Sequence, residues 1–171
     1  YYNSEFVNKM PLKQVEFLVG HEVLHAVYDH MGRRDNRDPK IWNIADDFCV
    51  NADLIDQRIG ERITVCGMLY DPKYKGMSAE EVYEQLMQNA DKINIDDLAK
   101  QLLDEHLDGN GDGDEEDGDG GKKGKNGRPK ISDEERRQIR DEIKEAVIAA
   151  AQAAGAGNLP GNVKRMIKDL T

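Results

Sequence analysis

The sequence contains few cysteines, no long apolar run and no excess of basic residues. Among its 171 residues are only two cysteines, Cys49 and Cys66, and they do not form a Cys-x-x-Cys pair. This usage favours a reduced, cytoplasmic compartment. No stretch approaches the roughly 20 apolar residues that cross a bilayer, so we expect no membrane partner.

The net charge of −10 is concentrated in one segment. Residues 104–119 contain nine acidic residues and no lysine or arginine, which leaves the rest of the chain close to neutral. A nucleic-acid-binding domain would carry a basic patch or stripe. We therefore expect no nucleic-acid partner.

The composition divides the chain into three parts. Residues 107–130 are rich in Gly, Asp, Glu, Asn and Lys and have almost nothing to bury, which is typical of a flexible linker. Residues 1–106 are long enough for a domain with its own core, and residues 131–171 are expected to be a helical segment. Because the chain starts without methionine and ends in a helical pattern, we expect it to be part of a longer protein.

Apolar residues at helical spacing predict a mainly α fold. A first helix is predicted from about Pro11 to Met31, where Gly32 suits its C-terminal stop. Asp38 suits the N-cap of a second helix. Residues 59–70 favour a short strand or an irregular loop, so a small β element is expected at most, with an α+β fold as the alternative. Further helices are predicted to begin near Ser78, Ile95, Ser132 and Val163.

One stretch of the first predicted helix carries the chemistry: His21-Glu22-Val23-Leu24-His25 has the pattern His-Glu-x-x-His. Residues four apart lie on the same face of a helix, so His21 and His25 can bind one ion. Zinc binds imidazole nitrogen, and a catalytic zinc needs three protein ligands and an open position for water. Glu22 points about 100° away from His21, where a base can take a proton from that water.

The second predicted helix offers two candidates for the third ligand, Asp46 and Asp47. Asp47 lies beside the apolar residues Ile44 and Phe48 and four residues before Asn51, so it shares a face with Asn51. Asp46 falls on a more polar side of the same helix. We predict that Asp47 is the ligand, with Asp46 as the alternative, and that Asn51 holds the second ring nitrogen of a histidine.

Two other histidines fit the site less well. His30 lies five residues after His25, so a continuous helix turns it about 140° away. We expect His30 to be a helix-end residue whose cation suits the helix dipole. His106 adjoins the acidic segment and is expected to be solvated. The tyrosines that could stabilise an oxyanion are Tyr28, Tyr70 and Tyr74.

The motif and several later stretches resemble a predicted bacterial and phage metallopeptidase domain. The resemblance covers residues 1 to about 90 and 157–170. It implies a zincin-like fold with zinc on His21, His25 and an acidic residue of the second helix. It also implies a von Willebrand A-like domain C-terminal to this one in the full chain. Outside the motif, the matching stretches are Arg33-Arg34, Asp38-Pro39, Trp42-Asn43-Ile44-Ala45, Asp47, Val50-Asn51, Tyr70-Asp71 and residues 76–83.

The leading functional hypothesis is zinc-dependent hydrolysis of peptide bonds in a protein or peptide substrate, with Glu22 as general base. The alternative is a non-catalytic, metal-stabilised interaction or assembly module. A closed structural site would have a fourth protein ligand in place of the water, which distinguishes the two hypotheses.

Residues 108–119 partly match a calcium-binding EF-hand loop. Positions 1, 3, 5 and 6 of the loop fit, but position 12 is Asp119 instead of glutamate. Glycines and lysines follow where a helix should leave the loop. We therefore interpret this segment as part of the acidic linker.

We expect a synthetic peptide of residues 104–127 to show no heat of binding when it is titrated with millimolar calcium. The physical reason is that the loop lacks its final bidentate ligand and its second helix. Isothermal titration calorimetry is the measurement. A saturable heat at one calcium ion per peptide would contradict the interpretation as a linker.

Overall fold

The protein is built from helices. The computed structural model describes residues 3–103, 132–155, 157 and 159–170. Within these ranges no strand forms, so the mainly α fold is confirmed and the α+β alternative is wrong. None of the described helices is long and apolar enough to cross a membrane. The helices are α1 (Ser4–Val7), α2 (Leu12–Val27), α3 (His30–Arg33), α4 (Pro39–Asp56), η1 (Pro72–Tyr74), α5 (Ala79–Gln88), α6 (Ile95–Ala99), α8 (Asp133–Ala154) and α9 (Gly161–Leu170).

The helix starts predicted from the sequence are confirmed. Asp38 is the N-cap of α4, where its carboxylate accepts a hydrogen bond from the backbone N–H of Ile41 at 2.9 Å. Complete capping boxes at Ser78 and Ser132 begin α5 and α8. The linker predicted for residues 107–130, the partial calcium loop within it and His106 lie outside the described residues.

Residues 59–70 form an irregular loop along α2, where no strand appears. The backbone N–H of Glu61 donates to the carbonyl of Lys13 at 2.9 Å. The side chain of Gln14 donates to Thr64 Oγ1 at 2.9 Å and accepts from the backbone N–H of Thr64 at 3.3 Å. Helix α2 thus supplies hydrogen bonds that a neighbouring strand would otherwise provide.

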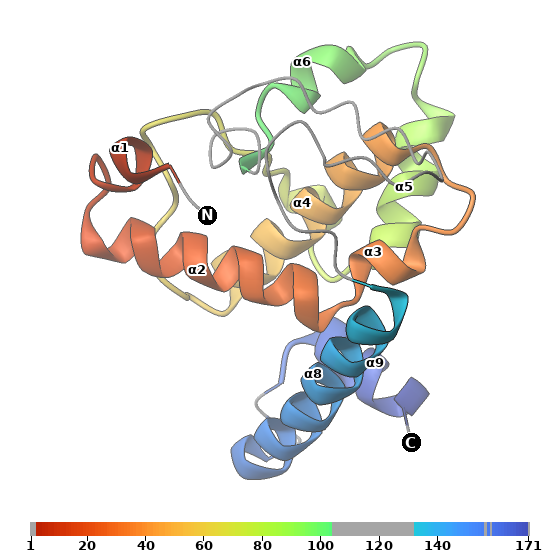
Figure 1. The fold of residues 1–171 in the computed structure, drawn as a ribbon. Coiled ribbons are helices and arrows are strands. Elements are labelled where there is room, and N and C mark those ends of the chain that lie inside the picture. The colour runs from red at the N-terminus through yellow and green to blue at the C-terminus, as the bar shows by residue number, and fades with distance from the viewer. Residues whose placement is uncertain (1–2, 104–131, 156, 158, 171) are drawn as a thin grey trace.

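Helix α4 is the central element of the core. It lies between α2 and α5 in Figure 1 and packs against both. From Ile44 to Leu54 every residue of α4 is buried, because neighbours cover all of its faces. The polar residues among them therefore need partners inside the protein. These buried polar residues are Asp46, Asp47, Asn51 and Asp53.

The first long helix ends earlier than the sequence predicts. Helix α2 stops at Val27, and Asp29 adopts the left-handed conformation with φ 49° and ψ 43°. A continuous helix to Met31 is therefore wrong, and Gly32 lies inside the short helix α3. The segment after this break is stabilised by α4, because the indole N–H of Trp42 donates to the carbonyl of His30 at 2.9 Å.

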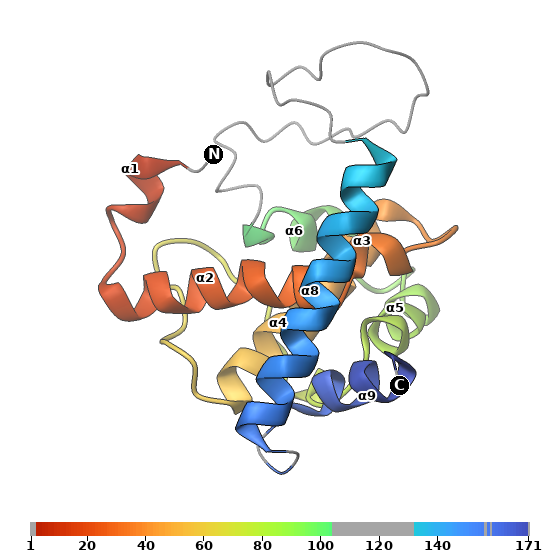
Figure 2. The ribbon, with the colours of Figure 1, turned by 60° about the horizontal axis from the view of Figure 1, so that its bottom comes forward.

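Helices α8 and α9 pack back on the first part of the chain. Helix α8 crosses α2 in Figure 2, and Arg140 Nε lies 3.1 Å from Asp29 Oδ1. On α9, the buried Asn162 donates through Nδ2 to Asp53 Oδ2 at 2.8 Å and to the carbonyl of Met77 at 3.2 Å. Helix α9 is thereby attached to α4. The boundaries of the three predicted parts stay a prediction.

We expect the substitution Asp53→Asn to change how stability depends on pH. Burial raises the pKa of Asp53, although hydrogen bonds from Asn162 and Tyr28 partly offset this. The folded protein therefore holds this proton more tightly than the unfolded chain does. The stability that this bound proton contributes is present below the unfolded pKa of about 3.9 and is lost as the pH rises through the pKa of Asp53 in the folded protein.

Asparagine keeps an acceptor oxygen but does not ionise. The free energy of unfolding of Asp53→Asn minus that of the native protein should therefore increase between about pH 4 and about pH 7. Urea unfolding at several pH values measures this difference. A difference that does not vary with pH would show that Asp53 does not carry the shift.

Candidate metal centre

Two histidines of α2 point toward the same place at its contact with α4. His21 and His25 are one helical turn apart, and their Nε2 atoms lie 3.0 Å from each other. The His21 ring is fully buried, whereas His25 is half-buried. Two ring nitrogens this close in a buried place are well suited to share a cation, either a proton or a metal ion.

Asp47 of α4 completes the group. Its Oδ1 lies 3.5 Å from His21 Nε2 and 3.3 Å from His25 Nε2. Ligands bound tetrahedrally to zinc at about 2.0–2.1 Å lie about 3.3 Å from each other. The three observed separations of 3.0, 3.3 and 3.5 Å therefore fit one metal ion. The backbone N–H of Leu103 donates to Asp47 Oδ2 at 3.3 Å and orients the carboxylate.

Asn51 holds the outer side of the His21 ring. Its Oδ1 lies 2.9 Å from His21 Nδ1, and its Nδ2 donates to the carbonyl of Leu69 at 2.8 Å. The bond to Leu69 orients the amide, so Oδ1 is the acceptor and His21 Nδ1 carries a hydrogen. Nε2 of His21 is then the nitrogen that faces the ion position. The role of Asn51 in supporting a metal ligand stays a prediction.

The neighbouring carboxylates of Asp46 and Asp47 differ in protonation. Burial raises the pKa of Asp46 to about 9, and the charge of Asp47 adds to this shift. Burial also acts to raise the pKa of Asp47, but the charges and hydrogen bonds of His21 and His25 outweigh it and hold this pKa below its usual range. At neutral pH, Asp47 is thus the charged acid of the pair, and it lies beside both Nε2 atoms.

Burial alone would lower the pKa of His21, but the charge of Asp47, the hydrogen bonds with Asp47 and Asn51 and the charge of Glu22 together outweigh it and raise this pKa to about 9. The metal-free group therefore contains a buried pair of opposite charges, the His21 imidazolium and the Asp47 carboxylate. A metal ion would take the place of the imidazolium proton, since imidazole binds metal only when that nitrogen is deprotonated.

The expectation for His30 is wrong. Because the left-handed Asp29 interrupts the helix, Nδ1 of His30 lies 3.0 Å from Nδ1 of His25. The His30 ring is only 3% exposed, and burial lowers its pKa to about 2, so it is neutral and not a solvated cation. The sequence signal for this helix break is Asp29 alone, a residue type that tolerates the left-handed conformation.

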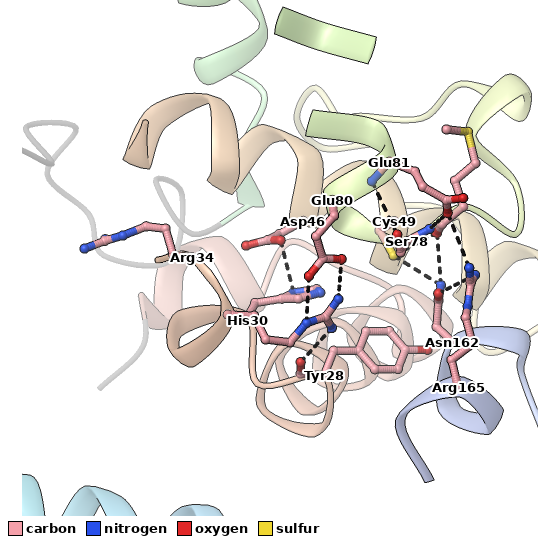
Figure 3. Close-up of polar contacts among 12 residues, drawn as sticks. Tyr28, His30, Arg34, Asp46, Cys49, Ser78, Glu80, Glu81, Asn162 and Arg165 are labelled. Atoms are coloured by element: carbon pink, nitrogen blue, oxygen red, sulfur yellow. Dashed lines mark hydrogen bonds and ion pairs between the residues drawn. The ribbon is translucent and has the colours of Figure 1, made fainter. Parts of the chain in front are cut away.

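His30 also adjoins Asp46, as Figure 3 shows, with 3.6 Å between His30 Nδ1 and Asp46 Oδ1. Together with His25 they form a second group whose ligand-type atoms lie within 4.8 Å of one another. Within the described ranges, two buried atoms of this group, His30 Nε2 and Asp46 Oδ1, have no hydrogen-bond partner. Such buried unpaired atoms are rare in proteins.

Glu22 lies on the exposed side of α2, next to His21 in the sequence. Its negative charge is among the causes that raise the pKa of His21. Glu22 is thus exposed to solvent and acts electrostatically on a member of the ligand group.

Two of the tyrosines considered for the oxyanion are engaged elsewhere. Tyr28 is buried and donates its hydroxyl to Asp53 Oδ2 at 2.8 Å. Tyr74 is also buried, and its ring centroid lies 4.8 Å from that of Phe48. The structure therefore does not bring Tyr28 or Tyr74 to the ligand group.

A helical domain with a buried group of two histidines and one aspartate defines a candidate metal-binding protein. The whole chain, residues 1–171, matches the sequence profile of a family described as "Putative metallopeptidase domain", and the chain belongs to that family. This membership also makes a bound metal ion the expected cofactor.

A protein of Thermotoga maritima described as "Uncharacterized protein" is 44% identical over 52 residues. The shared segment covers 29% of this chain and 13% of the relative. No solved structure matches the chain.

The two neighbouring aspartates provide a matched test of the ligand group. We expect Asp47→Asn to weaken zinc binding by more than about 100-fold, because it removes a charged ligand and not merely a supporting hydrogen bond. Asp46→Asn should change it by less than about 3-fold, because a neutral carboxyl is replaced by a neutral amide of the same shape. Competition with a chromophoric chelator measures both affinities. Equal losses in the two variants would contradict the assignment of Asp47.

Proposed function

We propose that this domain is a zinc-dependent peptidase that hydrolyses a protein or peptide substrate. The observation that carries the proposal is the convergence of His21 Nε2, His25 Nε2 and Asp47 Oδ1 to separations of 3.0, 3.3 and 3.5 Å. Membership in a family of metallopeptidase domains supports the same function.

Zinc is the proposed metal because two imidazoles and one carboxylate are the protein ligands of a common class of catalytic zinc site. In the part of the chain that the structure describes, the group with Asp47 has three members, which leaves a fourth position for water. When bound, zinc lowers the pKa of water toward about 7 and polarises the scissile carbonyl.

Glu22 is the proposed general base. Its carboxylate would accept a proton from the attacking water and pass it to the leaving amine, a role typically worth about 10²–10⁴-fold in rate. Asp47 would keep a negative charge among the ligands, and Asn51 would keep the hydrogen of His21 on Nδ1. The short distances from Asp47 and Asn51 to the ring nitrogens of His21, and the charge of Glu22 acting on His21, support these proposed roles.

We further propose that the domain acts in the cytoplasm, next to a C-terminal von Willebrand A-like domain of the full chain. The Thermotoga maritima relative supports a longer chain, because the shared segment is only 13% of its length. The resemblance noted in the sequence is the basis for the identity of that second domain.

A metal-stabilised interaction or assembly module is the alternative function. It would require a closed site with a fourth protein ligand, and removal of the metal would lower the melting temperature without affecting any hydrolysis. The three-membered ligand group and the solvent-exposed Glu22 favour the peptidase.

Two substitutions separate the roles within the motif. We expect Glu22→Gln to keep zinc at one ion per chain but to lose hydrolysis by about 10²–10⁴-fold, because the amide cannot accept the proton. His21→Ala should lose both zinc and hydrolysis. Metal analysis and digestion of a random peptide library, read by mass spectrometry, measure the two properties. Full cleavage by Glu22→Gln would refute the mechanism, and zinc-loaded wild-type protein that cleaves nothing would favour the module.

A further inference from the structure

We infer that His30 is a positioning residue that holds His25 in the tautomer and orientation needed to bind the metal. This inference rests on the proposed zinc site, because it concerns how one of its ligands is supported. It assigns a role to a buried histidine that lies outside the His-Glu-x-x-His motif.

His25 and His30 share one hydrogen atom between their rings. The Nδ1 atoms of His25 and His30 lie 3.0 Å apart, so one nitrogen donates a hydrogen and the other accepts it. If zinc binds Nε2 of His25, the neutral ring carries its hydrogen on Nδ1. His30 is then the acceptor, and its own hydrogen lies on Nε2.

His30 is held firmly enough to orient a neighbour. Its carbonyl accepts the indole N–H of Trp42 at 2.9 Å, and its ring lies between those of Tyr28 and Trp42, with centroid distances of 5.5 and 6.2 Å. Arg33 of the same short helix donates to the carbonyl of Tyr28 at 2.9 Å and pairs with Glu80. These contacts attach the short helix α3, which carries His30, to α4 and α5.

The other histidine ligand, His21, has the same kind of hydrogen-bonded support. Asn51 of α4 accepts from Nδ1 of His21 at 2.9 Å, just as His30 of α3 would accept from Nδ1 of His25 at 3.0 Å. Each ring therefore has its Nδ1 hydrogen directed at a fixed acceptor and its Nε2 directed at Asp47. Loss of such a partner typically weakens metal binding by about 10–100-fold.

A second metal ion at His25, His30 and Asp46 is the competing explanation for this cluster. It would require His25 to bind two ions at once and to lose both ring hydrogens. A single ion with His30 as a support does not require this, so the geometry favours the supporting role.

The test compares His30→Asn with His30→Leu. The two side chains have nearly the same shape, but only asparagine places an acceptor oxygen where His30 has Nδ1. We expect His30→Leu to weaken zinc binding by about 10–100-fold, and His30→Asn to stay within about 3-fold of the wild-type protein. Thermal unfolding of the metal-free proteins shows whether each variant is folded.

A second measurement needs no variant. In zinc-loaded wild-type protein with ¹⁵N-labelled histidine, the hydrogen on His25 Nδ1 should be visible by NMR and should exchange slowly with water, because it is bonded to His30. In His30→Leu the same hydrogen should exchange faster, and in His30→Asn it should stay protected.

Three results would overturn the inference: unchanged zinc affinity in His30→Leu, equal losses in both variants, or two zinc ions per wild-type chain. Failure of the proposed function gives a different pattern. Wild-type protein that binds one zinc but cleaves no peptide refutes the peptidase. The zinc affinities of His30→Leu and His30→Asn then still test the role of His30. Wild-type protein that binds no zinc refutes both proposals.

Discussion

The structure depends on one buried charge, the Asp47 carboxylate between two imidazoles. An isolated buried charge is strongly unfavourable unless it is paired and hydrogen-bonded. Asp47 is 2% exposed, and it is stabilised by His21 and His25 on α2 and by the backbone N–H of Leu103. The contact between α2 and α4 is therefore electrostatic as well as apolar, and any ion bound there would replace a proton that is already held between the same partners.

Helix α4 makes this arrangement possible because it is covered on all sides. Its three buried carboxylates face different neighbours: Asp47 faces α2, Asp46 faces α3, and Asp53 faces α9. The C-terminal helix is thus attached, through Asn162, to the helix that provides the carboxylate.

Much of the site could be predicted because its signals are local in the sequence. The four-residue spacing of His21 and His25 places both rings on one face of a helix. The spacing of Asp47 and Asn51 on the second helix likewise brings a carboxylate and an amide to one side, and the capping residues Asp38, Ser78 and Ser132 mark helix starts by local hydrogen bonds. Their roles in chemistry stay predictions until metal binding and cleavage are measured.

The sequence by itself determined the longer helices, where they start and the pair of histidines, since these follow from spacing and from contacts within a few residues. Only the tertiary structure decided the place of His30 and the shape of residues 59–70. His30 reaches His25 because Trp42 and Arg33 hold a left-handed turn at Asp29, and Gln14 of α2 bonds to the loop at Thr64 where no second strand lies beside it. Both outcomes depend on residues distant in the chain, which no local pattern specifies.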